Sequence, residues 1–330
     1  MRAIKPLPLT EDALIAAIRE VVGAPVRPLR VGIGDDAAAW QPNAHHLALI
    51  TTDLLSDGVH FRLAHTSPEA LGAKALAESL SDVAAMGGSP TVAVVGLGLC
   101  ATIDEAWIRG FYRGMAALAS RSRCAIAGGD IVRAPALAIA ITVVGEVRRT
   151  SMRLRSGARA GDVAAVTGAL GLGAAGLRLL DAGVRKGHAV ERYLTPEPRL
   201  AEGRFLGSRR AVHAMMDLSD GLSTDLGRMA RASGVDAVVE RERLDVHPSV
   251  EIAGVDPIDL ILHGGDDYEL LVAVDPRAFA HVARAFRARF SRPLAPVGRF
   301  EAGTEAVWIE SNGKRRPLAP SGYDHLRGQL

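Results

Sequence analysis

Hydrophobic and polar residues alternate in blocks along the chain, and the blocks have the lengths of helices and strands. Apolar residues spaced three and four apart predict helices from Thr10, from Pro68 and over residues 104–121, 172–182, 222–232 and 276–290. Short apolar runs predict buried strands over residues 47–52, 91–99, 124–127, 136–147, 163–167 and 268–274. Strands and helices that take turns in this way predict an α/β or α+β fold.

A polar connection rich in arginine and glycine interrupts this pattern near residue 150. A chain of 330 residues, 48% of them hydrophobic, is longer than one ordinary core accommodates. We therefore expect two α/β domains, covering residues 1–148 and 149–330.

Composition argues against several classes of function. The formal net charge is only +2 and basic residues are scattered among acidic ones, whereas nucleic-acid-binding proteins concentrate them on one face or tail. No apolar run reaches the roughly 20 residues that cross a bilayer, and residues 1–6 carry no apolar signal core. Cys100 and Cys124 lie in apolar runs without zinc-ligand spacing, which predicts two buried reduced thiols. We expect a cytoplasmic protein with no nucleic-acid or membrane partner.

The most informative feature is a series of aspartates flanked by glycine or serine at the ends of predicted elements. Asp53 and Asp130 are predicted to end strands, and Asp82 lies near the end of an apolar helix. Further acidic clusters occur at residues 35–36, 57, 217–220 and 266–267. One such aspartate is more often part of a turn than a ligand. Several of them adjoin apolar runs, however, where an unpaired carboxylate is costly and a shared cation removes that cost.

Carboxylate and hydroxyl oxygens are hard ligands, which suit Mg²⁺ better than they suit softer metals. Mg²⁺ held between carboxylates and substrate phosphates is the usual arrangement in phosphoryl transfer. The sequence therefore predicts a magnesium-dependent enzyme that moves a phosphoryl group from ATP.

Other nucleotide-binding signals are absent or incomplete. The chain has no GxxxxGK[ST] P-loop and no protein-kinase HRD or DFG motif. The glycine run 168–173 lacks the full dinucleotide fingerprint, so a tight strand-to-helix turn accounts for it. His60 stands out among the histidines because it follows an acidic turn. Arg155 and Arg199 are candidate phosphate clamps, because a guanidinium matches the oxygens of a phosphate.

Taken in order, the motifs resemble those of the thiamine-monophosphate kinase family. Its superfamily also holds aminoimidazole ribonucleotide synthetase, selenophosphate synthetase and the hydrogenase maturation factor HypE. The resemblance covers nearly the whole chain, and GGDDYEL together with GYDH marks the kinase rather than its relatives. The motifs are GIGDD (32–36), TTDLLSDGVHF (51–61), SLSDVAAMGGSP (79–90), GGDIVR (128–133), RSGARAGD (155–162), DLSDGLSTDLG (217–227), GGDDYEL (264–270) and SGYDHL (321–326).

The resemblance implies a PurM-like fold of two α/β domains, the first of which binds ATP and Mg²⁺ and forms a homodimer through its strands. It implies direct in-line phosphoryl transfer from ATP to thiamine monophosphate, with several Mg²⁺ ions. The implied metal ligands are Asp36, Thr51, Thr52, Asp53, Asp82, Asp130, Asp217 and Asp220. The implied ATP contacts are Gly129, Asp130, Arg155 and Ser219, and the implied substrate contacts are His60, Asp266 and Tyr323. By the same resemblance, the residues expected to carry catalysis are Asp53, Asp130, Asp217 and Arg155.

The chain departs from the family pattern at three places. Residues 8–12 replace the usual Gly-Glu-Phe, Leu172 stands where aspartate is common, and Asp57 stands where glutamate is common. These departures leave the implied ligand set intact. Three alternatives stay open: another ATP-dependent enzyme of the superfamily, a non-catalytic Mg²⁺–nucleotide binding module, and a metal-dependent phosphatase. A selenophosphate synthetase is disfavoured because no cysteine precedes Asp35.

Overall fold

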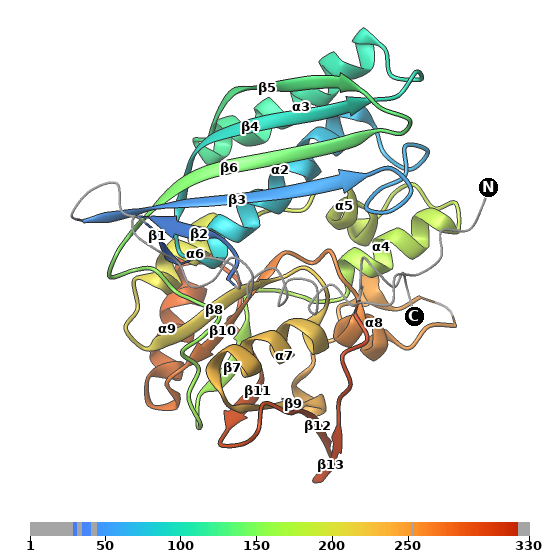
Figure 1. Ribbon diagram of the computed structural model, residues 1–330. Helices are drawn as coiled ribbons and strands as arrows, with labels where there is room; N and C mark the ends of the chain where they lie inside the picture. Colours follow the sequence, from blue (N-terminus) through green and yellow to red (C-terminus); the bar gives the residue numbers. More distant parts are fainter. Residues whose placement is uncertain (1–28, 32–34, 41–44, 253, 323–330) are drawn as a thin grey trace.

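The computed structural model describes residues 29–31, 35–40, 45–252 and 254–322. The helix predicted from Thr10, and Tyr323 of the implied substrate site, lie outside these residues. Two β-sheets with helices packed on them make up the described part of the chain (Figure 1). Among the described helices, none is both long and apolar enough to cross a lipid bilayer.

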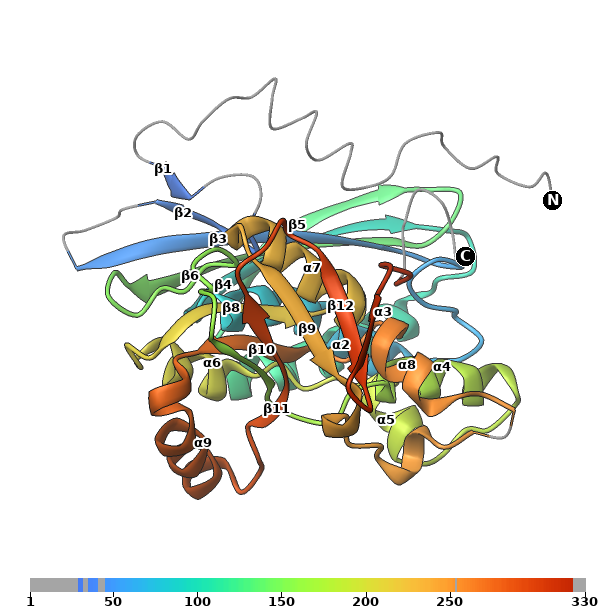
Figure 2. The same cartoon turned by 90° about the horizontal axis from the view of Figure 1, so that it is seen from below.

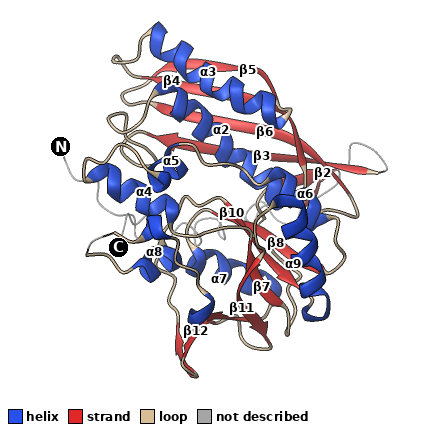
Figure 3. Ribbon diagram, turned by 180° about the vertical axis from the view of Figure 1, so that it is seen from behind, coloured by secondary structure: helices blue, strands red, loops and turns tan. Residues whose placement is uncertain are grey.

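The first sheet has six strands in the order β1-β2-β3-β6-β4-β5. Its neighbouring strands are antiparallel except for β4 and β5, which are parallel. Helices α2 (Pro68–Ala85) and α3 (Glu105–Ser122) lie on one face of the sheet (Figures 1 and 3). The strands are β1 (Leu29–Val31), β2 (Ala38–Trp40), β3 (His46–Ser56), β4 (Ser89–Leu99), β5 (Ala125–Arg133) and β6 (Ala138–Arg148).

Helix α2 is the central helix of the molecule. Ser67 defines its start, because its side chain accepts a backbone amide hydrogen bond, and Pro68 favours the first turn. Glycine lets α3 approach closely, since a Cβ on Gly72 would lie only 1.9 Å from the carbonyl oxygen of Phe111. Apolar residues of α2 share one hydrophobic core with strands of both sheets. Polar groups on this buried helix must therefore find partners inside the protein.

The second sheet has seven described strands in the order β13-β12-β9-β11-β7-β10-β8. Figure 2 labels β8 to β12 of this sheet. Its strands are β7 (Val163–Val166), β8 (Val212–Leu218), β9 (Asp236–Glu240), β10 (Glu269–Val274), β11 (Ala295–Glu301), β12 (Val307–Ser311) and β13 (Lys314–Pro317). The remaining helices are α4 (Leu172–Asp181), α5 (His188–Leu194), α6 (Leu200–Gly207), α7 (Leu222–Ser233), α8 (Pro257–His263) and α9 (Pro276–Phe290). Every described strand up to Arg148 belongs to the first sheet, and every described strand from Val163 onward belongs to the second.

The predicted α/β class is confirmed, and the predicted helices within the described residues are correct to within a few residues. Two predicted strand ends are wrong, because β3 continues to Ser56 and β5 to Arg133. Asp53 and Asp130 consequently lie inside strands rather than after them. Apolar runs underestimate these strands because exposed and edge positions carry polar residues or glycine within the same ladder. The apolar pattern also missed five strands of the second sheet, including β8.

Candidate active site and metal centre

Three carboxylates from distant parts of the chain converge where α2 passes between the two sheets. Asp36 precedes β2, Asp82 lies in the last turn of α2, and Asp217 lies near the end of β8. Each offers one oxygen atom, and these atoms lie within 4.8 Å of one another. The structure therefore brings together three of the residues that the resemblance implies as metal ligands.

Two serines of α2 hold aspartates that belong to opposite sheets. Ser79 Oγ donates a hydrogen bond of 2.5 Å to Oδ2 of Asp53 on β3. Ser81 Oγ donates a hydrogen bond of 2.7 Å to Oδ2 of Asp217 on β8. Both serines are fully buried, so these bonds fix the carboxylates without competition from water. The run from Ser79 to Asp82 thus ties the two sheets together at the acidic cluster.

The cluster carries an excess of negative charge. Burial raises the pKa of Asp82 well above its usual range, and the carboxylates of Asp53, Asp217 and Asp36 raise it further. Burial and the neighbouring Asp36 likewise raise the pKa of Asp217. The nearest positive group among the described residues is Arg155, whose Nη2 lies 2.7 Å from Oδ1 of Asp36. One guanidinium does not balance four closely spaced carboxylates.

The donor set fits a divalent cation. Oδ2 of Asp36 is buried and has no hydrogen-bond partner within the described part of the chain. Leaving a buried carboxylate oxygen unpaired is costly, whereas a bound cation would satisfy it. Converging carboxylate oxygens are the ligands that Mg²⁺ prefers. Asp36, Asp82 and Asp217 would hold such an ion, with Asp53 beside them.

Adjacent residues of β3 face opposite sides of the first sheet. The Thr51 hydroxyl donates to Asp82 and so reaches the cluster. The Thr52 hydroxyl is hydrogen-bonded across to β6 at 3.0 Å, on the face away from α2 and α3.

Asp130 also lies on the face away from the cluster. The register through β6 and β4 aligns it with Leu54, which is on the same face as Thr52. Its strand, β5, is an edge strand and Asp130 is exposed on it. Three strand spacings, roughly 14 Å, separate β5 from β3. Within one chain, neither Thr52 nor Asp130 joins the acidic cluster, and the burial argument applied to Asp130 from the sequence does not hold.

The other implied nucleotide and metal contacts have structural partners. At Gly129 a Cβ would lie 1.8 Å from a carbonyl oxygen of β4, so close strand packing requires glycine there. The carbonyl of Ser219 accepts the backbone amide of Asp266 at 2.9 Å. Asp220 forms an ion pair with Arg228. Ser219 and Asp220 follow directly on β8, so they border the cluster without belonging to it.

His60 and Asp266, the two implied substrate contacts that the structure describes, are linked by residues that the sequence analysis did not select. The Tyr193 hydroxyl donates to the carbonyl of His60 at 3.4 Å. Lys74 Nζ lies 3.8 Å from the centroid of the Tyr193 ring and 2.7 Å from Oδ2 of Asp266. Lys74 could have been recognised in the sequence by its residue type, because the chain has only four lysines beside 35 arginines and this lysine lies in an apolar helix.

Two other candidate phosphate contacts are occupied by protein carboxylates. Arg199 forms a buried ion pair with Glu269, at 2.8 Å from Nε to Oε2 and 2.5 Å from Nη2 to Oε1. These donors are therefore not free to clamp a phosphate. The backbone amides of Gly171 and Gly173 donate to Asp267 at 2.6 and 3.0 Å. The glycine run 168–173 is thus a strand-to-helix turn, as predicted, whose amides a carboxylate already binds.

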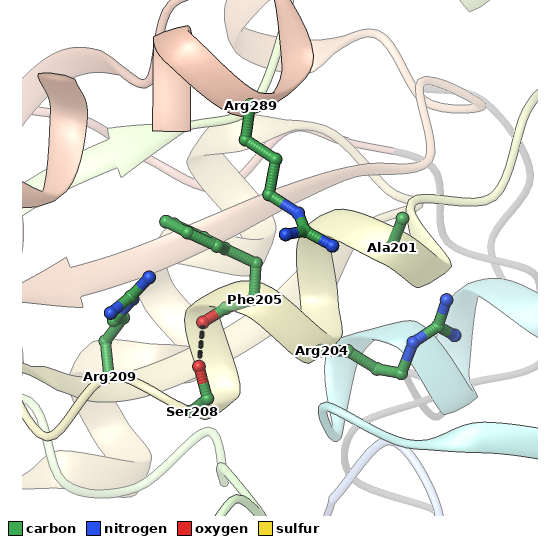
Figure 4. Close-up of a pocket in the computed structure, with 6 residues that line it drawn as sticks. All are labelled: Ala201, Arg204, Phe205, Ser208, Arg209 and Arg289. Atoms are coloured by element: carbon green, nitrogen blue, oxygen red, sulfur yellow. Dashed lines mark hydrogen bonds between the residues drawn. The ribbon is translucent and has the colours of Figure 1, made fainter. Parts of the chain in front are cut away.

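A separate cavity of about 250 Å³ lies beside α6 and the last turn of α9 (Figure 4). Its lining residues are Ala201, Arg204, Phe205, Ser208, Arg209 and Arg289. None of the implied site residues that the structure describes lines it. Arg204 and Arg289 lie in the last turns of their helices, where positive charge complements the helix dipole. The helix ends therefore account for the charge of this cavity without a ligand.

Comparison with known proteins identifies the family. The models of the AIR synthase related protein, N-terminal and C-terminal domains, match residues 34–147 and 159–309. Thiamine-monophosphate kinase of Bacillus subtilis (strain 168) is 33% identical over 306 residues, which cover 90% of this chain and 94% of the relative. The chain belongs to the thiamine-monophosphate kinase family.

Further relatives support this membership. Thiamine-monophosphate kinase of Escherichia coli (strain K12) is 33% identical over 325 residues, which cover 96% of this chain and 98% of the relative. A solved structure of AaThiL complexed with AMPPCP and TMP superimposes with a TM-score of 0.83 at 30% identity, covering 98% of this chain and 100% of that one. The two-domain PurM-like fold that the resemblance implied is therefore confirmed for this chain.

Proposed function

We propose that this chain transfers a phosphoryl group from ATP to thiamine monophosphate, with Mg²⁺, and so produces thiamine diphosphate and ADP. Membership of the thiamine-monophosphate kinase family supports the substrate and the donor. One observation carries the magnesium requirement: three carboxylates converge, and one of their buried oxygens has no partner among the described residues. We further propose a cytoplasmic location, because the reaction consumes ATP.

The chemical obstacle is the mutual repulsion of two anionic phosphates. Mg²⁺ bound at Asp36, Asp82 and Asp217 would offset that charge. The acceptor is a phosphate oxygen, which is already ionised at neutral pH, so no general base is needed. The protein's task is therefore to position the two phosphates and keep the carboxylates in place. Ser79 and Ser81 perform the second task through their hydrogen bonds.

Arg155 and Asp266 supply complementary charge at the two ends of this site. Nε of Arg155 is buried and has no hydrogen-bond partner within the described residues, so it is free to donate to a phosphate oxygen. The carboxylate of Asp266 remains partly exposed and would lie favourably near the cationic thiazolium ring. Both roles rest on family membership together with these contacts.

We also propose a homodimer that forms through the face of the first sheet away from α2 and α3. Leu54, Val94 and Val132 lie on this face and are 65%, 42% and 56% exposed. Large apolar side chains gathered on one exposed face favour association. Asp130 shares this face, so a second copy would bring it toward the metal site that it does not reach within its own chain. This arrangement accounts for an implied metal ligand on an exposed edge strand.

The direct test is a turnover assay that measures ADP and thiamine diphosphate together, with and without Mg²⁺. The wild-type chain should form both in equal amounts only when thiamine monophosphate and Mg²⁺ are present. Asp53→Asn should fold but lose activity by about a thousandfold or more, as loss of electrostatic stabilisation does in other enzymes. Asp245→Asn, which alters an exposed aspartate, is the matched control and should keep full activity.

The same assay separates the alternatives. ADP release that does not depend on thiamine monophosphate would indicate a different enzyme of the superfamily. Phosphate release without ATP would indicate a phosphatase. Nucleotide binding without any turnover would indicate a binding module and would contradict the proposal.

A further inference from the structure

A buried lysine in α2 is surrounded by groups of both halves of the molecule. Lys74 Nζ donates to Oδ2 of Asp266 at 2.7 Å and to the carbonyl oxygen of Tyr193 at 3.3 Å. It also lies 3.8 Å from the centroid of the Tyr193 ring and 4.0 Å from Oε1 of Glu78. Only 3% of the Lys74 side chain is exposed, whereas 31% of the Asp266 side chain is exposed. The lysine therefore acts on its surroundings through Asp266, which is the member of the pair that a ligand can touch.

The loop that carries Asp266 has an unusual backbone. Asp266 and Tyr268 adopt left-handed φ angles of 65° and 50°, although neither is glycine. Such angles persist only where neighbouring groups hold them, and they concentrate at functional sites. Backbone bonds from Asp266 to Ser219 and from Tyr268 to Leu218 hold the loop, each at 2.9 Å. These bonds hold the backbone at residues 266–268 in a strained turn, which leaves the Asp266 carboxylate partly exposed.

Both oxygens of that carboxylate are held from inside the protein. Lys74 binds Oδ2, and the Tyr268 hydroxyl donates to Oδ1 at 3.1 Å. Tyr268 is itself buried. The rotation of the carboxylate is therefore fixed before any substrate binds, which lowers the entropy lost on binding.

Lys74 also connects Asp266 with His60, the other implied substrate contact, through Tyr193. Tyr193, against whose ring and carbonyl Lys74 packs, donates through its hydroxyl to the carbonyl of His60 at 3.4 Å. His60 follows β3 of the first sheet, and Asp266 precedes β10 of the second (Figure 1). Lys74 and Tyr193 thus form a bridge between the two sides of the implied thiamine phosphate site.

We propose that Lys74 is a positioning residue of the thiamine phosphate site, one that fixes the Asp266 carboxylate and its distance from His60. This inference rests on the proposed function of the chain. A compact ammonium suits the position, because its donors point in different directions, whereas the larger planar guanidinium of arginine does not. The choice of lysine in a chain with 35 arginines follows from this geometry.

The test measures KM for each substrate separately. Lys74→Met should raise KM for thiamine monophosphate about tenfold or more, the effect of losing one charge-assisted hydrogen bond, and should leave KM for ATP within about twofold. Lys74→Arg should not restore the wild-type KM. Lys186→Met, at an exposed lysine between α4 and α5, is the matched control and should change neither value.

A double-mutant cycle decides whether Lys74 acts through Asp266. If it does, Lys74→Met combined with Asp266→Asn should raise KM for thiamine monophosphate no further than Asp266→Asn alone. An equal rise in both KM values, or an additive effect in the cycle, would show a merely structural lysine and overturn the inference.

Two further outcomes are distinguishable. If Lys74→Met does not fold, Tyr268→Phe removes the hydroxyl that donates to Oδ1 of Asp266 and also interacts with Glu78, and it should raise the same KM about threefold; an unchanged KM overturns the inference. If the wild-type chain does not use thiamine monophosphate at all, the proposed function is wrong. If the wild type uses it but the variants do not change its KM as described, only the role of Lys74 is wrong.

Discussion

Removal of one carboxylate from the acidic cluster should make the metal-free protein more stable and the enzyme inactive. Asp82 is the best choice, because burial and then the three carboxylates around it raise its pKa, whereas the hydrogen bond from the Thr51 hydroxyl lowers it. It also lies in the last turn of α2, where the helix dipole disfavours negative charge. Asp82→Asn removes the charge and keeps an acceptor oxygen for the hydrogen bond from Thr51.

The separation of the carboxylates sets the magnitude. Two unit charges at the 4.8 Å limit found for this cluster repel each other by about 3.5 kcal/mol at an effective dielectric constant of about 20. Arg155 offsets part of this repulsion, and partial protonation removes more. We therefore expect Asp82→Asn to raise the free energy of unfolding of the metal-free protein by about 1 to 3 kcal/mol. Each kcal/mol should raise Tm by roughly 2 to 4 °C.

The assay is thermal unfolding at pH 8, first in EDTA and then with Mg²⁺ and ATP. The wild type should be less stable than Asp82→Asn in EDTA and should gain about 2.7 kcal/mol at a ligand concentration one hundred times Kd. Asp82→Asn should gain little from Mg²⁺, and Asp245→Asn should behave like the wild type in both conditions. If Asp82→Asn is destabilised in EDTA, or keeps the full Mg²⁺ response, the repulsion argument is refuted.

Three further outcomes are expected. Burial and the neighbouring carboxylate raise the pKa of Asp35 to about 7, and burial and a second aspartate do the same for Asp225. The folded state then holds more protons than the unfolded state, so urea unfolding without metal should show stability falling as pH rises from about 4 to 7. A rise in stability over this pH range would contradict this expectation. Asp267→Asn weakens the closure of the glycine turn and should destabilise the fold by about 1 to 2 kcal/mol while leaving KM for ATP unchanged; a higher KM would mean that the turn binds phosphate. Mixing Asp130→Asn with Asp82→Asn, each inactive alone, should restore about a quarter of wild-type activity if dimer sites are shared; no recovery would contradict the shared site, because Asp130 does not reach the acidic cluster of its own chain.

The positions of α2, α3, α4, α7 and α9 could be predicted because the signals that define them are local, whereas the short helices α5, α6 and α8 were missed. Ser67 before Pro68 and Asp275 before Pro276 cap helices in the structure as their sequence suggests. The acidic motifs were also visible, because each sits in a short stretch of glycine, serine and aspartate. Local signals of this kind need no knowledge of which elements pack together.

The arrangement of the site could not be read from those signals. Which face of a sheet a residue occupies depends on the register of three successive strand pairs, and that register separates Asp130 from Asp82. The role of Lys74 depends on a loop 192 residues away. Arg199 matches a phosphate contact by residue type, but its partner Glu269 lies 70 residues away in sequence and no local signal indicates it. Long-range pairing decides all three cases.

Anomalous diffraction from crystals grown with Mn²⁺ and a non-hydrolysable ATP analogue tests the central claim most directly. Mn²⁺ replaces Mg²⁺ at sites built from oxygen ligands and gives an anomalous signal that locates it. We expect a peak between the carboxylates of Asp36, Asp82 and Asp217, in contact with the phosphates of the analogue. An ordered nucleotide without a metal peak among these three residues would contradict the account.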